Sequence, residues 1–284
     1  MTPCHICGEK NKLSQYWTVG LVKCGNCGMV YTDPQPTFAE LEKIYADEDY
    51  FRGLFYTDYV GDEKGFELNF RHRLETILQY APTGGKLFEA GCAFGFFLKQ
   101  AQHHWSEISG VDMSPDAVQY SRDTLGFDVT LGDFESRNLE PNSYDAVVMF
   151  DAIEHMYDPA LAIKKSAEAL RPGGIVALTT GDIGMRWAQW RGKNWRLIIP
   201  QHLFYFSEES LRYLLKENNL ELVHFSHPGN YRSLGQYSHI IAWRAQADSW
   251  RVKLAKQIQQ LPLMDVPFML NFNDIMFAIA RKVD

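Results

Sequence analysis

The chain has 284 residues, of which 46% are hydrophobic and 22% are charged. This length suits about two domains, and the balance is that of a globular protein, which excludes a largely disordered or fibrous chain. The net charge of −7 disfavours a large polyanion as the main partner. No stretch reaches the ~18 apolar residues of a membrane-spanning helix. The N-terminus shows no signal-peptide pattern. The zinc site described next needs reduced cysteines, so we expect a reducing compartment and hence a cytoplasmic protein.

Four of the five cysteines lie near the N-terminus in the spacing C-x2-C-x16-C-x2-C. Two short C-x-x-C turns can supply the four thiolates that a tetrahedral zinc ion needs. A glycine follows each pair and lets the chain turn with positive φ. The alternative, a redox dithiol, normally accompanies a βαβ unit, which this segment lacks. The sequence therefore predicts a structural zinc site in a small module, with the ligands Cys4, Cys7, Cys24 and Cys27.

The local composition and the predicted secondary structure divide the chain into three parts. Residues 1–36 form the predicted zinc module, which ends in a proline-rich linker. Residues 37–82 form a predicted helical lid or linker, with helices over 37–49 and 63–80. Residues 83–284 form the main domain, in which the role of the insertion at 229–270 stays open.

The main domain alternates short apolar runs with helical stretches. This alternation predicts a parallel sheet with helices on both faces. The predicted strands are 86–90, 108–112, 129–131, 146–150, 175–179 and a final strand at 275–280. The predicted helices are 94–103, 115–124, 159–170 and 207–218.

The first predicted strand leads into a glycine-containing turn, E-x-G-x-x-x-G, from Glu89 to Gly95. Glycines at such a turn let a ligand approach the backbone closely. Asp112 ends the next strand, where a carboxylate can bind both hydroxyls of a ribose. Beyond the third strand, Asp133 can accept from an adenine amino group and Phe134 can stack on the ring.

The acidic residues at these strand ends distinguish between two kinds of nucleoside ligand. A pyrophosphate favours helix N-termini without competing carboxylates. S-adenosylmethionine has no phosphate and carries a sulfonium and an ammonium group. Glu89, Asp133 and Asp151 would form an acidic rim that suits such a cation. The alternative is that these acids are helix caps or solvated loop charges.

The order E-x-G-x-x-x-G, D, G-D-F, Y-D-x-V, E-H and L-R-P-G-G over residues 65–225 resembles the class I S-adenosylmethionine-dependent methyltransferases. The resemblance implies an α/β fold with a Rossmann-like seven-stranded sheet and S-adenosyl-L-methionine as the donor. Ala93 replaces the middle glycine of the commoner family pattern, a small change. The implied donor-binding residues are Glu89, Gly91, Cys92, Gly95, Asp112, Met113, Asp133, Phe134, Phe150 and Asp151.

Two further segments narrow the resemblance. The block P-x-H-L-x-x-F-S at 200–207 and the cysteine module followed by D-P-x-P are similar to bacterial methyltransferases of polysaccharide and secondary-metabolite pathways. Some zinc-carrying relatives methylate carbon atoms of deoxysugars and carry Y-H-E-H where this chain has I-P-Q-H. This departure argues against C-methylation. We expect methyl transfer to a hydroxyl of a sugar or secondary metabolite.

A hydroxyl acceptor needs a general base, and histidine suits this role near pH 7. His155, just past the fourth strand, and His202 are the candidates. The alternative for each is a structural histidine bonded to the backbone.

Two other functions remain open. An RNA methyltransferase could use the zinc module as a reader, although the module carries only three lysines and no arginine. A non-catalytic adenosylmethionine-binding protein is the second alternative. We expect a small-molecule acceptor and a monomer or homodimer.

Overall fold

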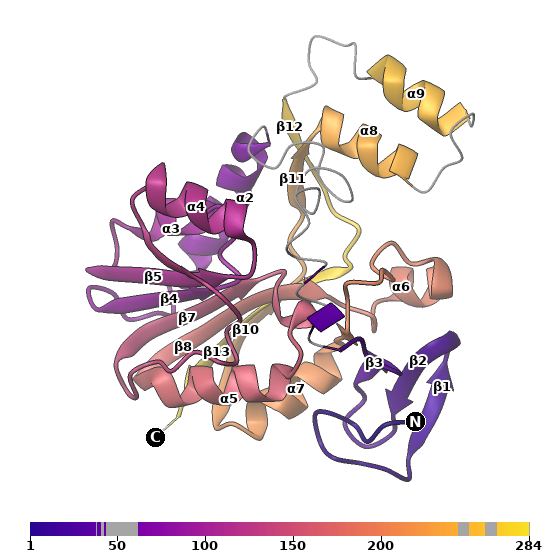
Figure 1. Ribbon diagram of the computed structural model, residues 1–284, viewed down its shortest axis with the longest axis horizontal. Coiled ribbons are helices and arrows are strands. Elements are labelled where there is room, and N and C mark those ends of the chain that lie inside the picture. Colours follow the sequence, from indigo (N-terminus) through magenta and orange to yellow (C-terminus); the bar gives the residue numbers. More distant parts are fainter. Residues whose placement is uncertain (38, 41–42, 44–61, 244–249, 259–265, 284) are drawn as a thin grey trace.

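The computed structural model describes residues 1–37, 39–40, 43, 62–243, 250–258 and 266–283. Figure 1 shows a large sheet covered by helices, a small N-terminal module of strands and a lobe that carries two helices. Among the described residues, no helix has the length and apolar character needed to cross a membrane. The helix predicted over 37–49 falls largely outside the described residues.

Seven strands form the main sheet in the order β10-β13-β8-β7-β4-β5-β6. Strands β4 to β8 pair in parallel, whereas β13 runs antiparallel to both β8 and β10. This arrangement confirms the predicted Rossmann-like methyltransferase sheet. Strand β10 was not among the predicted strands. The strands are β4 (Lys86–Ala90), β5 (Glu107–Asp112), β6 (Asp128–Leu131), β7 (Tyr144–Phe150), β8 (Leu170–Gly181), β10 (Leu220–Ser226) and β13 (Ile275–Lys282).

Helices cover both faces of this sheet (Figure 1). One face carries α2 (Glu63–Ile77), α3 (Phe96–Ala101) and α4 (Pro115–Asp123), and the other carries α5 (Pro159–Ala169) and α7 (Glu208–Lys216). Side-chain caps explain where three of them begin. Ser114, Asp158 and Ser207 each accept a hydrogen bond from an amide in the first turn, and proline follows the first two.

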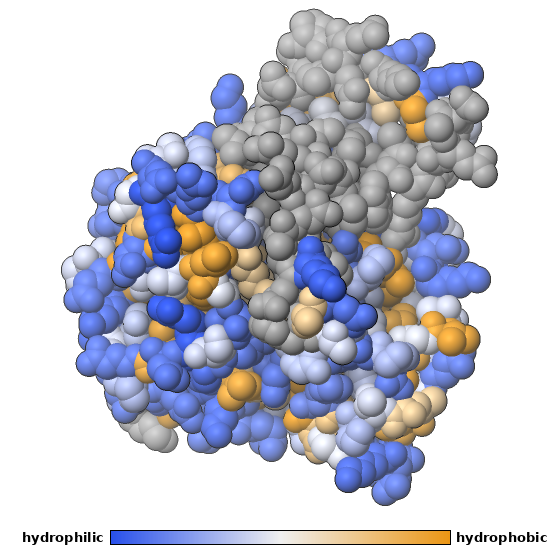
Figure 2. Space-filling model, in the orientation of Figure 1, coloured by the Kyte–Doolittle hydropathy of each residue, from blue (hydrophilic) through white to orange (hydrophobic). Residues whose placement is uncertain are grey.

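The two faces bury separate hydrophobic clusters because the parallel strands are apolar on both sides. On the face seen in Figure 2, hydrophilic residues dominate the coloured surface and hydrophobic residues form scattered patches.

The N-terminal module is joined to the main domain by strand pairing. Its strands β1 (Leu13–Tyr16), β2 (Thr18–Cys24) and β3 (Val30–Thr32) form a sheet whose fourth strand is β9 (Phe204–Tyr205) from the main domain. The amide of Thr32 donates to the carbonyl of Leu203 at 2.9 Å, and the amide of Leu203 donates to the carbonyl of Glu154 at 2.9 Å. The module is therefore hydrogen-bonded, through one residue, to the segment that follows β7.

The segment 229–270 contributes the third part of the molecule. Strands β11 (Asn230–Ser233) and β12 (Pro267–Leu270) pair antiparallel, and helices α8 (Leu234–Trp243) and α9 (Trp250–Ile258) lie beyond them (Figure 1). Helix α2 packs against β11, and the Asn69 side chain exchanges two hydrogen bonds with the backbone of Tyr231.

A buried carboxylate anchors the start of β13. Asp274 is 1% exposed. It accepts hydrogen bonds from the indole of Trp195 at 2.8 Å and from Nη2 and Nε of Arg196 at 2.8 and 3.0 Å. Removing Asp274 leaves the buried Trp195 N–H without an acceptor, whereas Arg196, with 35% of its side chain exposed, can turn to solvent. Loss of such a buried acceptor costs about 1–3 kcal/mol.

We therefore expect Asp274→Ala to lower the free energy of unfolding by about 1–3 kcal/mol in urea denaturation, because the buried Trp195 N–H loses its acceptor. The matched control is Arg212→Ala, which removes the exposed pair with Glu208. Exposed pairs of this kind contribute about 0.5 kcal/mol. Equal losses for the two variants would contradict the anchoring role of Asp274.

Candidate functional site

The glycine-containing turn after β4 is held by close packing. Gly91 and Gly95 have φ of 72° and 76°, in the left-handed region. A Cβ at Gly91 would lie 2.7 Å from the Ala152 side chain, and a Cβ at Gly95 would lie 2.2 Å from Oγ of Ser121. Ala93, which replaces the family's middle glycine, also has positive φ, at 43°. Both glycines are thus required by the chain's own packing, which also brings the turn against the end of β7.

Asp112 joins this turn to the end of β5. Its two carboxylate oxygens accept from the amides of Ala93 at 2.8 Å and Ser114 at 2.9 Å. Burial raises the pKa of this carboxyl group, and the backbone hydrogen bonds oppose the rise. The predicted ribose-binding acid therefore lies directly beside the turn.

Glu89 is the most deeply buried acid of the site, with 2% of its surface exposed. Its Oε2 has no hydrogen-bond partner among the described residues. Burial, and then the charge of Asp112, raise its pKa well above the ordinary value, and Arg73 opposes this. A buried carboxylate without a partner is costly. An ammonium group beside it would supply the missing partner, so the residues fit the cationic end of S-adenosylmethionine.

Arg73 is a residue of this site that the sequence reasoning missed. It lies on α2, is 6% exposed, and its guanidinium stacks on the rings of Phe70 and Phe150 at 5.4 and 5.2 Å. Its Nη2 lies 3.8 Å from Oδ2 of Asp151 and 3.3 Å from Oδ1 of Asn230. The signal was an arginine on the apolar stripe of the helix, between Phe70 and Ile77.

Asp151 immediately follows β7 and is the last of the predicted donor-binding residues along the chain. It has φ of 50°, and its Oδ1 accepts from the Thr179 hydroxyl at 2.9 Å. Phe150, one residue earlier, is buried against Phe97, with ring centroids 4.7 Å apart. The carboxylate of Asp151 is thereby aimed at the edge where β7 and β8 end.

The other predicted donor-binding residues are placed less directly. Asp133 spends both carboxylate oxygens on the amide and hydroxyl of Ser136 in its own turn, at 2.6 and 2.7 Å. The Phe134 ring is buried against Phe88, so it is packed in the core rather than open for stacking. Cys92 is buried against β5, and Met113 is partly buried on the opposite cluster.

The two histidines predicted as bases lie together, with ring centroids 4.6 Å apart. Nδ1 of His155 contacts the carbonyl of Gln201 at 3.0 Å. Burial lowers the pKa of His155 to about 4 and moves that of His202 well below its usual value. Both rings are therefore neutral at pH 7.

Glu154 completes this cluster. It is 4% exposed, and burial followed by the charge of Asp151 raises its pKa to about 8. Ligand atoms of Glu154, His155 and His202 lie within 4.8 Å of one another, a donor set that could hold a divalent ion.

The four N-terminal cysteines also converge. Their sulfurs lie within 4.8 Å of one another, and the Cys4–Cys27 and Cys7–Cys24 pairs are each 3.6 Å apart. Four sulfurs at about 2.3 Å from a tetrahedral zinc ion would be about 3.8 Å apart. Gly8 and Gly28 have φ of 70° and 75°, as predicted for the turns. The geometry fits a zinc ion.

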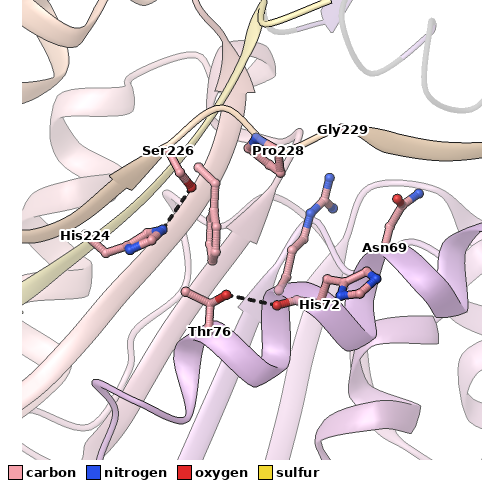
Figure 3. A pocket seen from close by; sticks show the side chains of 9 residues that line it. Asn69, His72, Thr76, His224, Ser226, Pro228 and Gly229 are labelled. Atoms are coloured by element: carbon pink, nitrogen blue, oxygen red, sulfur yellow. Dashed lines mark hydrogen bonds between the residues drawn. The ribbon is translucent and has the colours of Figure 1, made fainter. Parts of the chain in front are cut away.

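A small cavity of about 130 Å³ lies behind Arg73, between α2 and the end of β10. Figure 3 shows Asn69, His72 and Thr76 on the helix side and His224 and Ser226 on the strand side. Its size allows a few water molecules or a small ion.

The methyltransferase domain family matches residues 63–225, more than half of the chain. The chain therefore belongs to this family. Among curated proteins it is similar to a ubiquinone biosynthesis O-methyltransferase of Xanthomonas campestris pv. campestris. The two are 24% identical over 155 residues, which make up 52% of this chain and 65% of that relative. The match thus spans slightly less than two thirds of the relative's length.

Solved structures share the fold. The YcgJ protein from Bacillus subtilis has a TM-score of 0.55 at 16% identity, covering 75% of this chain and 99% of that chain. Phosphoethanolamine N-methyltransferase 2 from Haemonchus contortus, in complex with S-adenosyl-L-methionine, has a TM-score of 0.52 at 15% identity and covers 90% of this chain and 62% of that chain. Likeness at this identity concerns the fold alone.

The raised pKa of Glu89 has a consequence for ligand binding. Below that pKa the carboxyl group is protonated, and pairing with the ammonium of S-adenosylhomocysteine requires it to lose the proton. We expect binding to release a proton and the affinity to rise with pH up to that pKa. Calorimetry in buffers of different ionisation enthalpy measures the release.

Glu89→Gln should abolish the proton release and weaken binding by about 10- to 100-fold, as expected for a charged hydrogen bond. Glu107→Gln, an exposed acid at the other end of β5, is the control. Binding that releases no proton at any acidic or neutral pH would exclude Glu89 as the ammonium partner.

Proposed function

We propose that this protein transfers a methyl group from S-adenosyl-L-methionine to a hydroxyl of a small molecule, a sugar or secondary metabolite. The observation that carries the proposal is the buried, unpartnered carboxylate of Glu89 beside Asp112 and the glycine-containing turn. Three features supply complementary groups. Glu89 faces the donor's ammonium, Arg73 its carboxylate and Asp112 its ribose.

The donor supplies an activated methyl group on a sulfonium, so the protein's task is to position the acceptor and exclude water. Asp151 lies at the end of β7, between the donor-binding residues and the cluster of Glu154, His155 and His202 that follows it in the chain. We assign the acceptor side to this cluster. Because both imidazoles are neutral at pH 7, each can accept a hydrogen bond from an acceptor hydroxyl.

The O-methyltransferase activity named for the Xanthomonas relative favours oxygen as the acceptor atom. An acidic chain with no arginine in the cysteine module gives little support to an RNA substrate.

We expect S-adenosylhomocysteine at about 100 times its Kd to stabilise the protein by about 2.7 kcal/mol. This corresponds to a rise in Tm of about 5–10 °C for a chain of this size. Asp112→Ala should abolish the rise, because it removes the ribose carboxylate and frees the turn at Ala93. Differential scanning fluorimetry measures both.

The control is Asp128→Ala, an exposed acid at the start of β6, which should keep the full rise. A rise that survives Asp112→Ala contradicts the ribose assignment. Transfer of labelled methyl from the donor to small molecules of a cell extract separates an enzyme from a protein that only binds the donor. Label found in RNA would contradict the small-molecule acceptor and identify RNA as the substrate.

We also propose that Cys4, Cys7, Cys24 and Cys27 hold a structural zinc ion. A module of this size buries too little apolar surface to fold unaided, so the metal would add to the stabilisation that the module gains by packing on the main domain.

We expect one zinc ion per chain by elemental analysis of the purified protein. Cys24→Ser should lose the ion and lower the Tm, since three thiolates remain around the site. Cys92→Ser, at a buried cysteine far from the module in sequence, should keep the ion. Full zinc content in Cys24→Ser would contradict the assignment.

A further inference from the structure

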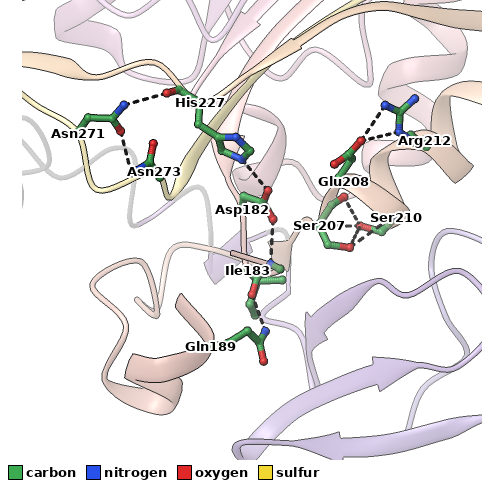
Figure 4. A network of polar contacts seen from close by, with 11 residues as sticks. Asp182, Ile183, Gln189, Ser207, Glu208, Ser210, Arg212, His227, Asn271 and Asn273 are labelled. Carbon is green, nitrogen blue, oxygen red and sulfur yellow. Dashed lines mark hydrogen bonds and ion pairs between the residues drawn. The ribbon is translucent and has the colours of Figure 1, made fainter. Parts of the chain in front are cut away.

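A second histidine–carboxylate pair lies at the edge of the sheet that carries the donor site. His227 follows β10, and its Nε2 lies 2.8 Å from Oδ2 of Asp182, which follows β8 (Figure 4). Strands β8 and β10 both run antiparallel to β13, so they point the same way. Their carboxyl ends therefore meet at one edge, together with the ends of β4, β5 and β7.

Asp182 is held rigidly. Its side chain is 4% exposed, its Oδ1 accepts from the amide of Gly184 at 2.8 Å, and its own amide donates to the carbonyl of Asp274 at 2.9 Å. Only Oδ2 is left for the imidazole. A carboxylate at Nε2 holds the proton on that nitrogen and leaves the lone pair on Nδ1.

The His227 side chain is partly accessible to solvent. It is 19% exposed, and Nδ1 has no hydrogen-bond partner in the part of the chain that the structure describes. The Asn271 amide donates to the His227 carbonyl at 3.0 Å and holds the backbone. A carboxylate-oriented histidine with a free ring nitrogen is the arrangement of a general base.

The neighbouring charges are already paired. Asp274 is bound by Arg196, and Glu208 is bound by Arg212, which stacks on the Phe225 ring beside His227. Asp182 is thus the carboxylate that contacts the imidazole. Its negative charge stabilises the imidazolium that forms when His227 takes a proton.

The pair lies at the same edge of the sheet as the cluster on the acceptor side. Thr179 of β8 bonds Asp151, and Thr180 bonds the Glu154 side chain. Asp182 comes two residues after Thr180, immediately past the end of β8. Asp151 is level with Thr179. Neighbouring strands are about 4.8 Å apart and each residue advances the chain by about 3.3 Å, so Asp182 lies one strand away from Asp151 and about 10 Å further along.

We propose that His227, oriented by Asp182, is the general base of the methyl transfer. Nδ1 removes the proton of the acceptor hydroxyl while the oxygen forms a bond to the methyl carbon. The bond between that carbon and sulfur breaks, and its electron pair stays on sulfur as the neutral thioether. The imidazolium then loses its proton to water. This inference rests on the proposed function.

The buried histidines are poorer candidates for this step. The pKa of His155 is lowered to about 4 by burial, and that of His202 is also lowered. A ring that resists protonation can accept a hydrogen bond but does not hold the transferred proton. We therefore assign different roles to these residues. His155 and His202 position the hydroxyl, and His227 accepts its proton.

The first test needs no acceptor. Sinefungin carries an amine where the donor carries its methyl-bearing sulfonium, so it places an ammonium at the transfer point, whereas S-adenosylhomocysteine does not. In nitrogen-15 NMR at pH 7, we expect the His227 Nδ1 signal to differ between the two complexes several-fold more than the signal of His103, which is exposed at the end of α3. Equal His227 signals in both complexes would overturn the proposal. Failure of both ligands to bind would instead refute the proposed function.

The second test is kinetic, using the extract fraction that accepts label from the unaltered protein. His227→Gln should keep the affinity for S-adenosylhomocysteine and lower kcat by about 100-fold or more, the usual share of a general base. Raising the pH should restore part of the rate, because a hydroxyl that ionises by itself needs no base. Asp182→Asn should show the same pattern more weakly, and His103→Gln should leave the rate unchanged. A His227→Gln variant with an unchanged rate, or a loss that pH does not relieve, would show that the pair only fastens β10 to β8.

Discussion

The buried carboxylate of Glu89 is the group on which the site depends. A carboxylate with 2% exposure and an unpartnered oxygen is unfavourable by itself, and the same burial raises its pKa. The chain tolerates it because Arg73 is nearby and because a cationic ligand can complete the pairing. The same residue that destabilises the empty site therefore gives the site its preference for a positively charged ligand over a pyrophosphate.

Around this group, the sheet brings together residues that are far apart in the chain. Arg73 comes from a helix before the first strand of the main sheet, and Asp151 and Asp182 come from the ends of β7 and β8. The antiparallel β13 lets β10 point the same way as β8, which places His227 at this edge. The cysteine module reaches the same region through Leu203, which links Thr32 to Glu154 by two backbone hydrogen bonds. The module is thus hydrogen-bonded to the chain segment that carries the histidine cluster.

Much of this could be predicted from local patterns. The parallel strands are short apolar runs, and the helices between them begin at caps such as Ser114 and Asp158. Strand β10 escaped prediction because its polar residues obscure any continuous apolar run. Phe134 illustrates a different limit, since the sequence shows an aromatic ring beside a strand end but not that the ring turns into the core against Phe88.

The sequence by itself determined the order of strands and helices, the spacing of the four cysteines and the acids at the strand ends, because these depend on neighbours along the chain. Only the tertiary structure decided which side chains meet. In the sequence, Arg73 is one charged residue on a predicted helix. The structure shows that it is buried between Phe70 and Phe150. His227 and Asp182 are 45 residues apart and carry no shared motif. Their pairing follows from the direction of β13, a long-range property that no local pattern encodes.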